Sequence, residues 1–203
     1  MATPCVFYHE GRAIIIYVHG DDYVSAGTTA NLKWLKTELE RKYQVKTQFL
    51  GPEEDQAKEI RILNRVIGWN GNEGISYEAD PRHTEIIIDQ LKLKDAKPVS
   101  TPGTKEEGRT QNGHESKLGE TESSHYRAIV ARCNYIAPDR PDIAYAAKEL
   151  ARHMANPTEG DWQRLKRLGR YLKGKPRLQQ VYKWQNEQTI LRVYSDADWA
   201  GCK

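Results

Sequence analysis

Two adjacent carboxylates, Asp21 and Asp22, are the side chains of this sequence best suited to chemistry. They follow Gly20 and lie between two short apolar runs, residues 14–18 and 23–26. Two ionised carboxylates ~4 Å apart repel by about 4 kcal/mol at an effective dielectric constant of ~20. A hard cation relieves this repulsion, and Mg²⁺ is typically held by one or two carboxylates together with substrate phosphates. Polymerases and nucleases use such ions in pairs, so the doublet is a candidate phosphoryl-transfer metal site.

The same doublet has a simpler interpretation, because Asp is common in solvent-exposed turns. Solvation of the turn or protonation of one carboxylate would also relieve the repulsion. The two residues alone leave these alternatives open.

A second candidate is a basic segment, residues 161–177, which carries a single acid, Asp161. Such a concentration of charge is typical of a surface that contacts a phosphate backbone, although a solvated helix face has the same composition. Its basic residues are Arg164, Lys166, Arg167, Arg170, Lys173, Lys175 and Arg177.

The Asp doublet is expected at or just past the turn of a β-hairpin. Residues 14–18 show no polar alternation, which predicts a strand buried on both faces. A short strand over residues 4–8 precedes this hairpin. A helix over residues 28–43 follows it, with leucines at helical spacing on one face.

The middle of the chain is expected to mix strands and one helix. A strand is predicted over residues 45–50, and a second hairpin joins residues 60–69 to residues 74–78 around an Asn-Gly-Asn turn. Asp80 and Pro81 are a typical helix start. That helix is expected to run to about Lys94, with a narrow apolar stripe.

Residues 103–123 are rich in Gly, Glu, Lys, Ser and Thr, and this composition predicts a flexible linker. Three helices are expected next, the first capped by Ser123 or Ser124 and ending near Ala137. The second buries Ile143, Ala147, Leu150 and Met154. The third, residues 158–173, buries Trp162, Leu165, Leu168 and Leu172. Two final strands, residues 181–184 and 189–194, are predicted to form a hairpin.

The length of 203 residues suits one large domain or two small ones. Three cysteines, Cys5, Cys133 and Cys202, are odd in number and far apart, which argues against a disulfide framework or a structural zinc site. No apolar run is long enough for a bilayer and no signal-peptide pattern is present. We therefore expect an intracellular protein, cytoplasmic or nuclear, with no membrane partner.

Seven short motifs lie at residues 20–27, 49–51, 101–102, 126–135, 140–146, 162–174 and 194–201. Singly they are weak, but their order and spacing together are specific. Together they resemble the Pol polyprotein of copia-type LTR retrotransposons, from the late reverse transcriptase to the first strand of RNase H.

This resemblance implies an α+β fold: a partial reverse-transcriptase palm and thumb, then a helical connection and an RNase H-like β-hairpin stub. The expected segments are 1–102 for palm and thumb, 103–123 for the linker, 124–177 for the connection and 178–203 for the start of RNase H.

The resemblance also implies a chemistry. Asp21 would bind Mg²⁺ directly, Asp22 would lie beside it, and Asp196 would be the first RNase H carboxylate. RNA template, DNA primer, RNA–DNA hybrid and the remaining Pol segments would be the partners. Because the family places a third polymerase carboxylate upstream of the hairpin, we expect this chain alone to be inactive.

Two features keep other hypotheses open. His19 and Gly20 depart from the aromatic residue that the family usually places two positions before the Asp pair, and Gly-Asp-Asp also occurs in viral RNA-dependent RNA polymerases, although the downstream motifs do not fit that rival. A non-catalytic remnant that binds nucleic acid through residues 161–177, chiefly Arg164, Lys166, Arg167, Arg170 and Lys173, is the alternative. An inert relic that folds poorly is a third.

Overall fold

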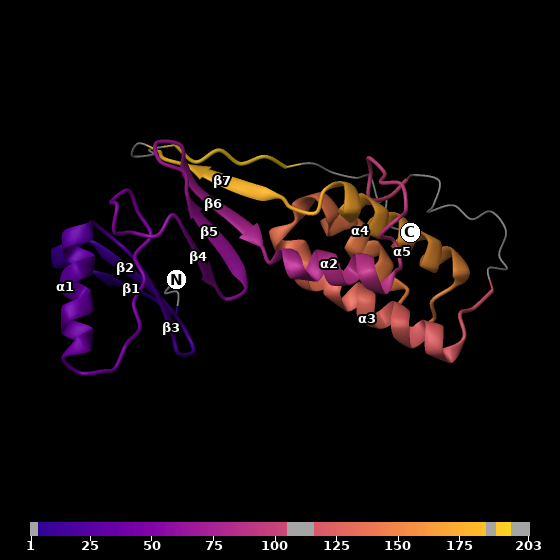
Figure 1. Ribbon diagram of the computed structural model, residues 1–203, viewed down its shortest axis with the longest axis horizontal. Coiled ribbons are helices and arrows are strands. Elements are labelled where there is room, and N and C mark those ends of the chain that lie inside the picture. Colours follow the sequence, from indigo (N-terminus) through magenta and orange to yellow (C-terminus); the bar gives the residue numbers. More distant parts are fainter. Residues whose placement is uncertain (1–3, 105–115, 186–189, 196–203) are drawn as a thin grey trace. The chain divides into compact units, whose positions relative to one another are not determined.

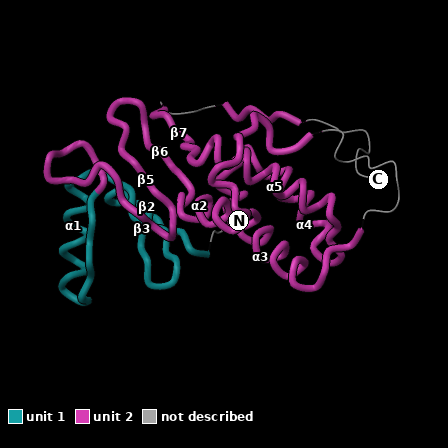
Figure 2. Tube along the Cα trace, turned by 45° about the vertical axis from the view of Figure 1, so that its right-hand side comes forward, with its two compact units in different colours: residues 1–49 teal, residues 50–203 magenta. Residues whose placement is uncertain are grey.

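The computed structural model describes residues 4–104, 116–185 and 190–195. The chain divides into two compact units, Met1–Phe49 and Leu50–Lys203, which are coloured separately in Figure 2. Each unit is described by itself below. The described residues form two antiparallel sheets and five α-helices, so the predicted α+β class is confirmed.

The first unit is a three-stranded sheet with one helix (Figure 1). Strands β1 (Val6–His9), β2 (Ile14–His19) and β3 (Asp22–Ala26) pair in that order, and a 3₁₀ turn, η1 (Glu10–Arg12), joins the first two. Helix α1 (Thr29–Glu40) begins at Thr28, whose hydroxyl accepts a hydrogen bond from the Asn31 amide. The predicted hairpin and helix are therefore confirmed.

The prediction that the strand over residues 14–18 is buried on both faces is wrong. Ile14 is fully buried, whereas Ile15 is 49% exposed and Tyr17 is 39% exposed. Helix α1 packs on the face that carries Ile14, where the His9 ring contacts the Trp34 ring at 5.4 Å between centroids. Among the described residues of this unit, no helix packs on the opposite face of the sheet, where Ile15 and Tyr17 lie. The apolar residues 14–18 therefore form a strand that is buried on one face only.

A four-stranded sheet opens the second unit, with β4 (Glu59–Ile62), β5 (Arg65–Trp69), β6 (Gly74–Ala79) and β7 (Gln179–Lys183) in spatial order. The β5–β6 hairpin confirms the predicted turn near residues 70–72. The single strand predicted over residues 60–69 is instead two. Leu63 and Asn64, at φ 48° and 61°, form a two-residue turn between them, the conformation that type I′ hairpins require at both positions.

Two other strand predictions are wrong. Residues 45–49 form no strand, and Leu50 makes only an isolated bridge with Ala57. At the other end, β7 pairs with β6, and residues 190–195, which include most of the strand predicted as its partner, have no regular secondary structure; residue 189 lies outside the described residues. The chain enters β7 directly after Arg177, whose guanidinium binds the β6 side chain Glu78 at 2.7 Å. This ion pair fixes the new strand to the edge of β6.

The rest of the second unit is a helical bundle beside the sheet (Figure 1). Its elements are α2 (Pro81–Gln90), α3 (Glu120–Ile136), the 3₁₀ turn η3 (Ala137–Asp139), α4 (Pro141–Arg152) and α5 (Glu159–Gly174). All four α-helices contribute to one core. Its fully buried members include Ile87, Tyr126, Ile129, Ile143, Ala147, Leu165, Leu168 and Leu172.

Helix α2 starts as predicted, since the Asp80 carboxylate accepts a hydrogen bond from the Arg82 amide and Pro81 follows the cap. It ends at Gln90 rather than near Lys94. Lys92 adopts φ 57°, a left-handed conformation typical of helix ends. Leu91 and Leu93, placed beyond the helix, then enter the core, so the segment packs more closely than its narrow stripe suggested.

Helix α3 begins at Glu120, earlier than predicted, because the Glu122 carboxylate accepts from the Gly119 amide at 3.2 Å. Leu118 packs against the core. The predicted linker, 103–123, therefore ends in ordered structure, and its residues 105–115 lie outside the described residues. Among the helices that are described, none is both long and apolar enough to cross a membrane.

Candidate functional site

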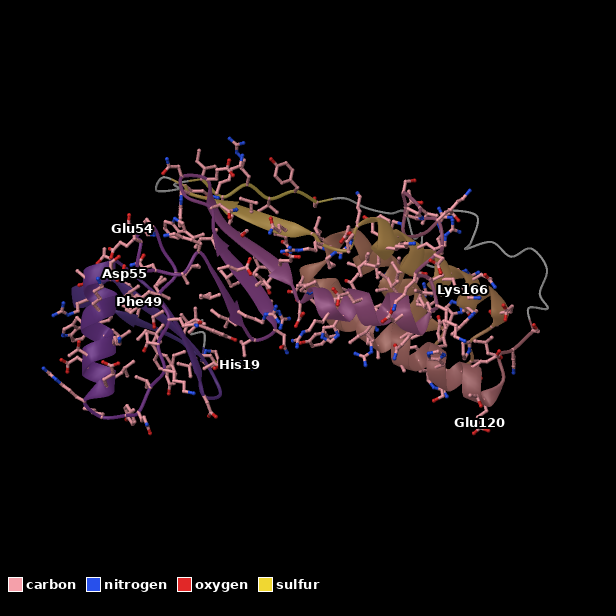
Figure 3. The ribbon with its side chains drawn as sticks, viewed as in Figure 1. His19, Phe49, Glu54, Asp55, Glu120 and Lys166 are labelled. Atoms are coloured by element: carbon pink, nitrogen blue, oxygen red, sulfur yellow. The ribbon has the colours of Figure 1, made fainter. Side chains whose placement is uncertain are left out.

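The Asp doublet lies at the tip of the β2–β3 hairpin. Gly20 and Asp21 form its two-residue turn, and Asp22 is the first residue of β3, directly opposite His19. Gly20 has φ 59°, a conformation that glycine adopts without steric cost. Both carboxylates are exposed. The predicted position, at or just past the turn, is confirmed; His19 is labelled in Figure 3.

The doublet has few neighbours that could complete a metal site. No hydrogen bond or ion pair joins the side-chain carboxylate of Asp21 or Asp22 to another described residue, and the Tyr17 hydroxyl lies 3.4 Å from His19 Nδ1. Across residues 4–104, 116–185 and 190–195, no group of three or more His, Cys, Asp or Glu side chains could hold a metal. Two carboxylate donors fit Mg²⁺ when phosphates and waters supply its other ligands. Asp196, the other predicted metal ligand, lies outside the described residues.

The first turn of α5 neutralises part of the predicted basic surface. Asp161, which is 1% exposed, accepts from the Thr158 amide at 2.9 Å in a capping box. Its other oxygen accepts from Arg164 at 2.7 Å. Arg164 is therefore positioned by a buried carboxylate on its own helix.

Three further basic side chains of α5 bind the irregular segment that follows α2, residues 91–101, here called the strap. Arg167 donates to the Thr101 hydroxyl at 2.8 Å, and Arg170 Nε donates to the Lys97 carbonyl at 2.7 Å. Lys173 donates to the carbonyls of Lys94 and Ala96. Local sequence patterns could not predict these hydrogen bonds, because the donors and acceptors are 66 to 79 residues apart.

Lys166 differs from these neighbours. It is labelled in Figure 3, and its ammonium lies 5.8 Å from the centroid of the Trp162 ring. Among the described residues, the Lys166 ammonium makes no hydrogen bond and has no carboxylate partner. Of the five predicted nucleic-acid contacts, it is therefore the side chain whose replacement disturbs the fold least.

The sequence analysis did not predict that Arg140 is buried and joins two helices. Its side chain is 2% exposed and binds Asp142 at 2.8 Å, and it also donates to the carbonyls of Lys175 and Pro176. Burial by itself raises the pKa of Asp142. The hydrogen bonds from Arg140 and Tyr171 and the charge of Arg140 outweigh this effect, so the pKa lies below its usual range. The Arg140–Asp142 motif thus joins the start of α4 to the end of α5.

A second buried group, around Asp139, joins the sheet to the bundle. Its carboxylate accepts from the Tyr77 hydroxyl at 2.7 Å and from Arg65 Nε at 3.0 Å. Its backbone carbonyl accepts from Gln180 at 3.1 Å. Burial raises the pKa of Tyr77, and the hydrogen bond to Asp139 raises it further. One residue of η3 therefore contacts three strands, β5, β6 and β7.

The chain resembles several proteins encoded by plant transposons. It is 33% identical over 206 residues to the "Retrovirus-related Pol polyprotein from transposon RE2" of Arabidopsis thaliana. The aligned region covers 98% of this chain and 13% of that protein. The corresponding protein from transposon RE1 of the same plant is 42% identical over 117 residues, 58% of this chain and 8% of that protein. The one from transposon TNT 1-94 of Nicotiana tabacum is 28% identical over 208 residues, 98% of this chain and 15% of that protein.

The chain thus spans a small part of each of these relatives, between 8% and 15% of their length. No protein-family model matches the chain, and no solved structure matches it significantly.

Proposed function

Because this chain is homologous to one segment of the retrovirus-related Pol polyproteins of copia-type transposons, we propose that it is part of a reverse transcriptase. The observation that carries the proposal is the placement of Asp21 and Asp22 at the tip of a tight hairpin, where both carboxylates are accessible. The intact polyprotein would perform magnesium-dependent nucleotidyl transfer at this tip, using an RNA template and a DNA primer.

The contribution of this chain would be positional. Phosphoryl transfer depends mainly on alignment of the reacting groups and on charge neutralisation. The turn at Gly20 and the β2–β3 pairing fix the two carboxylates on a rigid element, and Asp21 and Asp22 would hold Mg²⁺ there. When bound, Mg²⁺ neutralises the charge that develops on the transferred phosphate.

We expect no primer extension by this chain alone with Mg²⁺ or Mn²⁺, because among the described residues no third carboxylate joins Asp21 and Asp22 in a metal site. The same chain should still bind the metal weakly. Mn²⁺, a paramagnetic substitute, should broaden the backbone amide signals of residues 20–23 in an NMR titration of the full chain.

Asp21→Asn and Asp22→Asn should abolish that broadening, and Asp55→Asn, in an acidic loop elsewhere, is the matched control. Broadening that persists in both hairpin variants would overturn the proposed site. Robust extension by the isolated chain would instead refute its inactivity.

The alternative function, nucleic-acid binding by α5 without catalysis, is supported by Lys166, whose ammonium has no carboxylate partner among the described residues. Lys166→Ala should reduce the dependence of log affinity on log salt for an RNA–DNA hybrid by a slope of about 1, the value for one lost phosphate contact. Fluorescence anisotropy at several salt concentrations measures this slope.

Lys148→Ala, an exposed lysine of α4, should change the slope less. Arg167 and Arg170 are unsuitable for this test because they bind the strap. Equal slopes for both alanine variants and the parent would refute the alternative.

A further inference from the structure

The strap and α5 are fitted to each other along their length. A Cβ atom at Gly169 would lie 2.6 Å from Leu93 Cδ1 and 2.7 Å from Leu91 Cδ1, and one at Gly174 would lie 3.0 Å from Pro98 Cβ. The two glycines therefore allow the strap to approach the helix at both ends. Ala96 and Val99 of the strap also pack against the core. The strap is therefore packed closely against α5 and is part of the same folded unit.

This layer brings like charges together. The strap carries three lysines, Lys92, Lys94 and Lys97, and it covers a helix face that is itself basic. Lys94 is paired with Asp89 at 3.0 Å, and Asp95 is the only acid of the strap. The cations of strap and helix whose side chains have no carboxylate partner among the described residues include Lys92, Lys97, Lys166, Arg170 and Lys173.

The hydrogen bonds between strap and helix leave this charge in place, because their acceptors are neutral: three carbonyls and the Thr101 hydroxyl. Arg170 uses only Nε for the Lys97 carbonyl, so its two terminal amino groups keep their donors for another ligand. Arg170 can therefore bind the strap and a phosphate at the same time. A carboxylate partner, such as Glu78 provides for Arg177, would have removed this capacity.

We propose that the strap and α5 together form one binding surface for a polyanion, the phosphate backbone of nucleic acid. The inference extends the alternative function above, since it adds strap lysines to a surface previously confined to the helix. It also makes the two elements interdependent: bound phosphates relieve the mutual repulsion of the cations, so the polyanion should hold the strap more firmly on α5.

Lys97→Gln provides the test, because it removes a strap charge and keeps the carbonyl that binds Arg170. In the full chain, this change should lower the log–log salt slope for a 20-base-pair RNA–DNA hybrid by about 1. Lys148→Gln, on α4, is the matched control and should leave the slope near that of the parent. In hydrogen-exchange experiments, the hybrid should slow exchange of the amides of residues 94–101, whereas inorganic phosphate at equal phosphate concentration should not.

Several outcomes would contradict the proposal. If Lys97→Gln and Lys148→Gln lower the slope equally, binding is diffuse and the strap is no part of a site. If Lys166→Ala lowers the slope and Lys97→Gln does not, the helix binds alone, and the alternative function survives without the strap. If the hybrid leaves strap exchange unchanged or accelerates it, strap and polyanion are not mutually stabilising. None of these results bears on metal binding by Asp21 and Asp22.

Discussion

Arg140→Ala should destabilise residues 50–203 by about 3–5 kcal/mol, the usual effect of removing one partner of a buried ion pair. Arg140 is almost fully buried, and Asp142 is 18% exposed at its side chain. The change removes the charged partner of that carboxylate, which keeps its hydrogen bond from Tyr171, and leaves the carbonyls of Lys175 and Pro176, at the end of α5, without their donor. Urea unfolding followed by circular dichroism measures the loss.

Arg152→Ala is the matched control, because Arg152 ends α4, the helix that follows Arg140, and pairs with Glu149 at the surface. Such pairs contribute about 0–1 kcal/mol. Should Arg140→Ala unfold within about 1 kcal/mol of the control, the buried pair does not hold α4 and α5 together. A cooperative transition in the parent would also count against a poorly folded relic.

Asp139→Ala is expected to have the second largest effect: it should lower the free energy of unfolding by about 2–4 kcal/mol. It leaves the Tyr77 hydroxyl and the Arg65 guanidinium without their acceptor at the contact between sheet and bundle. The cost of a stranded charge is discounted here because the Arg65 side chain is 26% exposed and can regain water. The prediction is checked by the same unfolding experiment.

Two companions make this result specific. Asp139→Asn keeps an acceptor for Tyr77 and should lose less stability than Asp139→Ala. Asp95→Ala, at an exposed acid of the strap, should have little effect on unfolding. If Asp139→Asn costs as much as Asp139→Ala, the charge rather than the hydrogen bond to Tyr77 dominates. If neither variant is destabilised, the Asp139 carboxylate does not hold the sheet and the bundle together.

The sequence alone determined the elements whose signals are local. The apolar runs around Gly20 predicted the hairpin and the position of its two carboxylates. Asp80 and Pro81 predicted a helix start, since the Asp80 side chain caps an amide two residues away. The leucines of α5 predicted its buried edge. Each prediction needed only residues within one or two helical turns.

The tertiary structure alone decided what depends on distant partners. Whether an apolar strand is covered on both faces depends on which helix packs against it, so Ile15 and Tyr17 are exposed. The partner of β7 is more than 100 residues away in the sequence for its first residue pair, Glu78 with Gln179. The basic residues of α5 looked alike in sequence, but the fold pairs Arg164 with a carboxylate, places Arg170 and Lys173 on strap carbonyls and leaves Lys166 over a ring. Composition counts charges, whereas only the packed chain determines which of them remain available to a ligand.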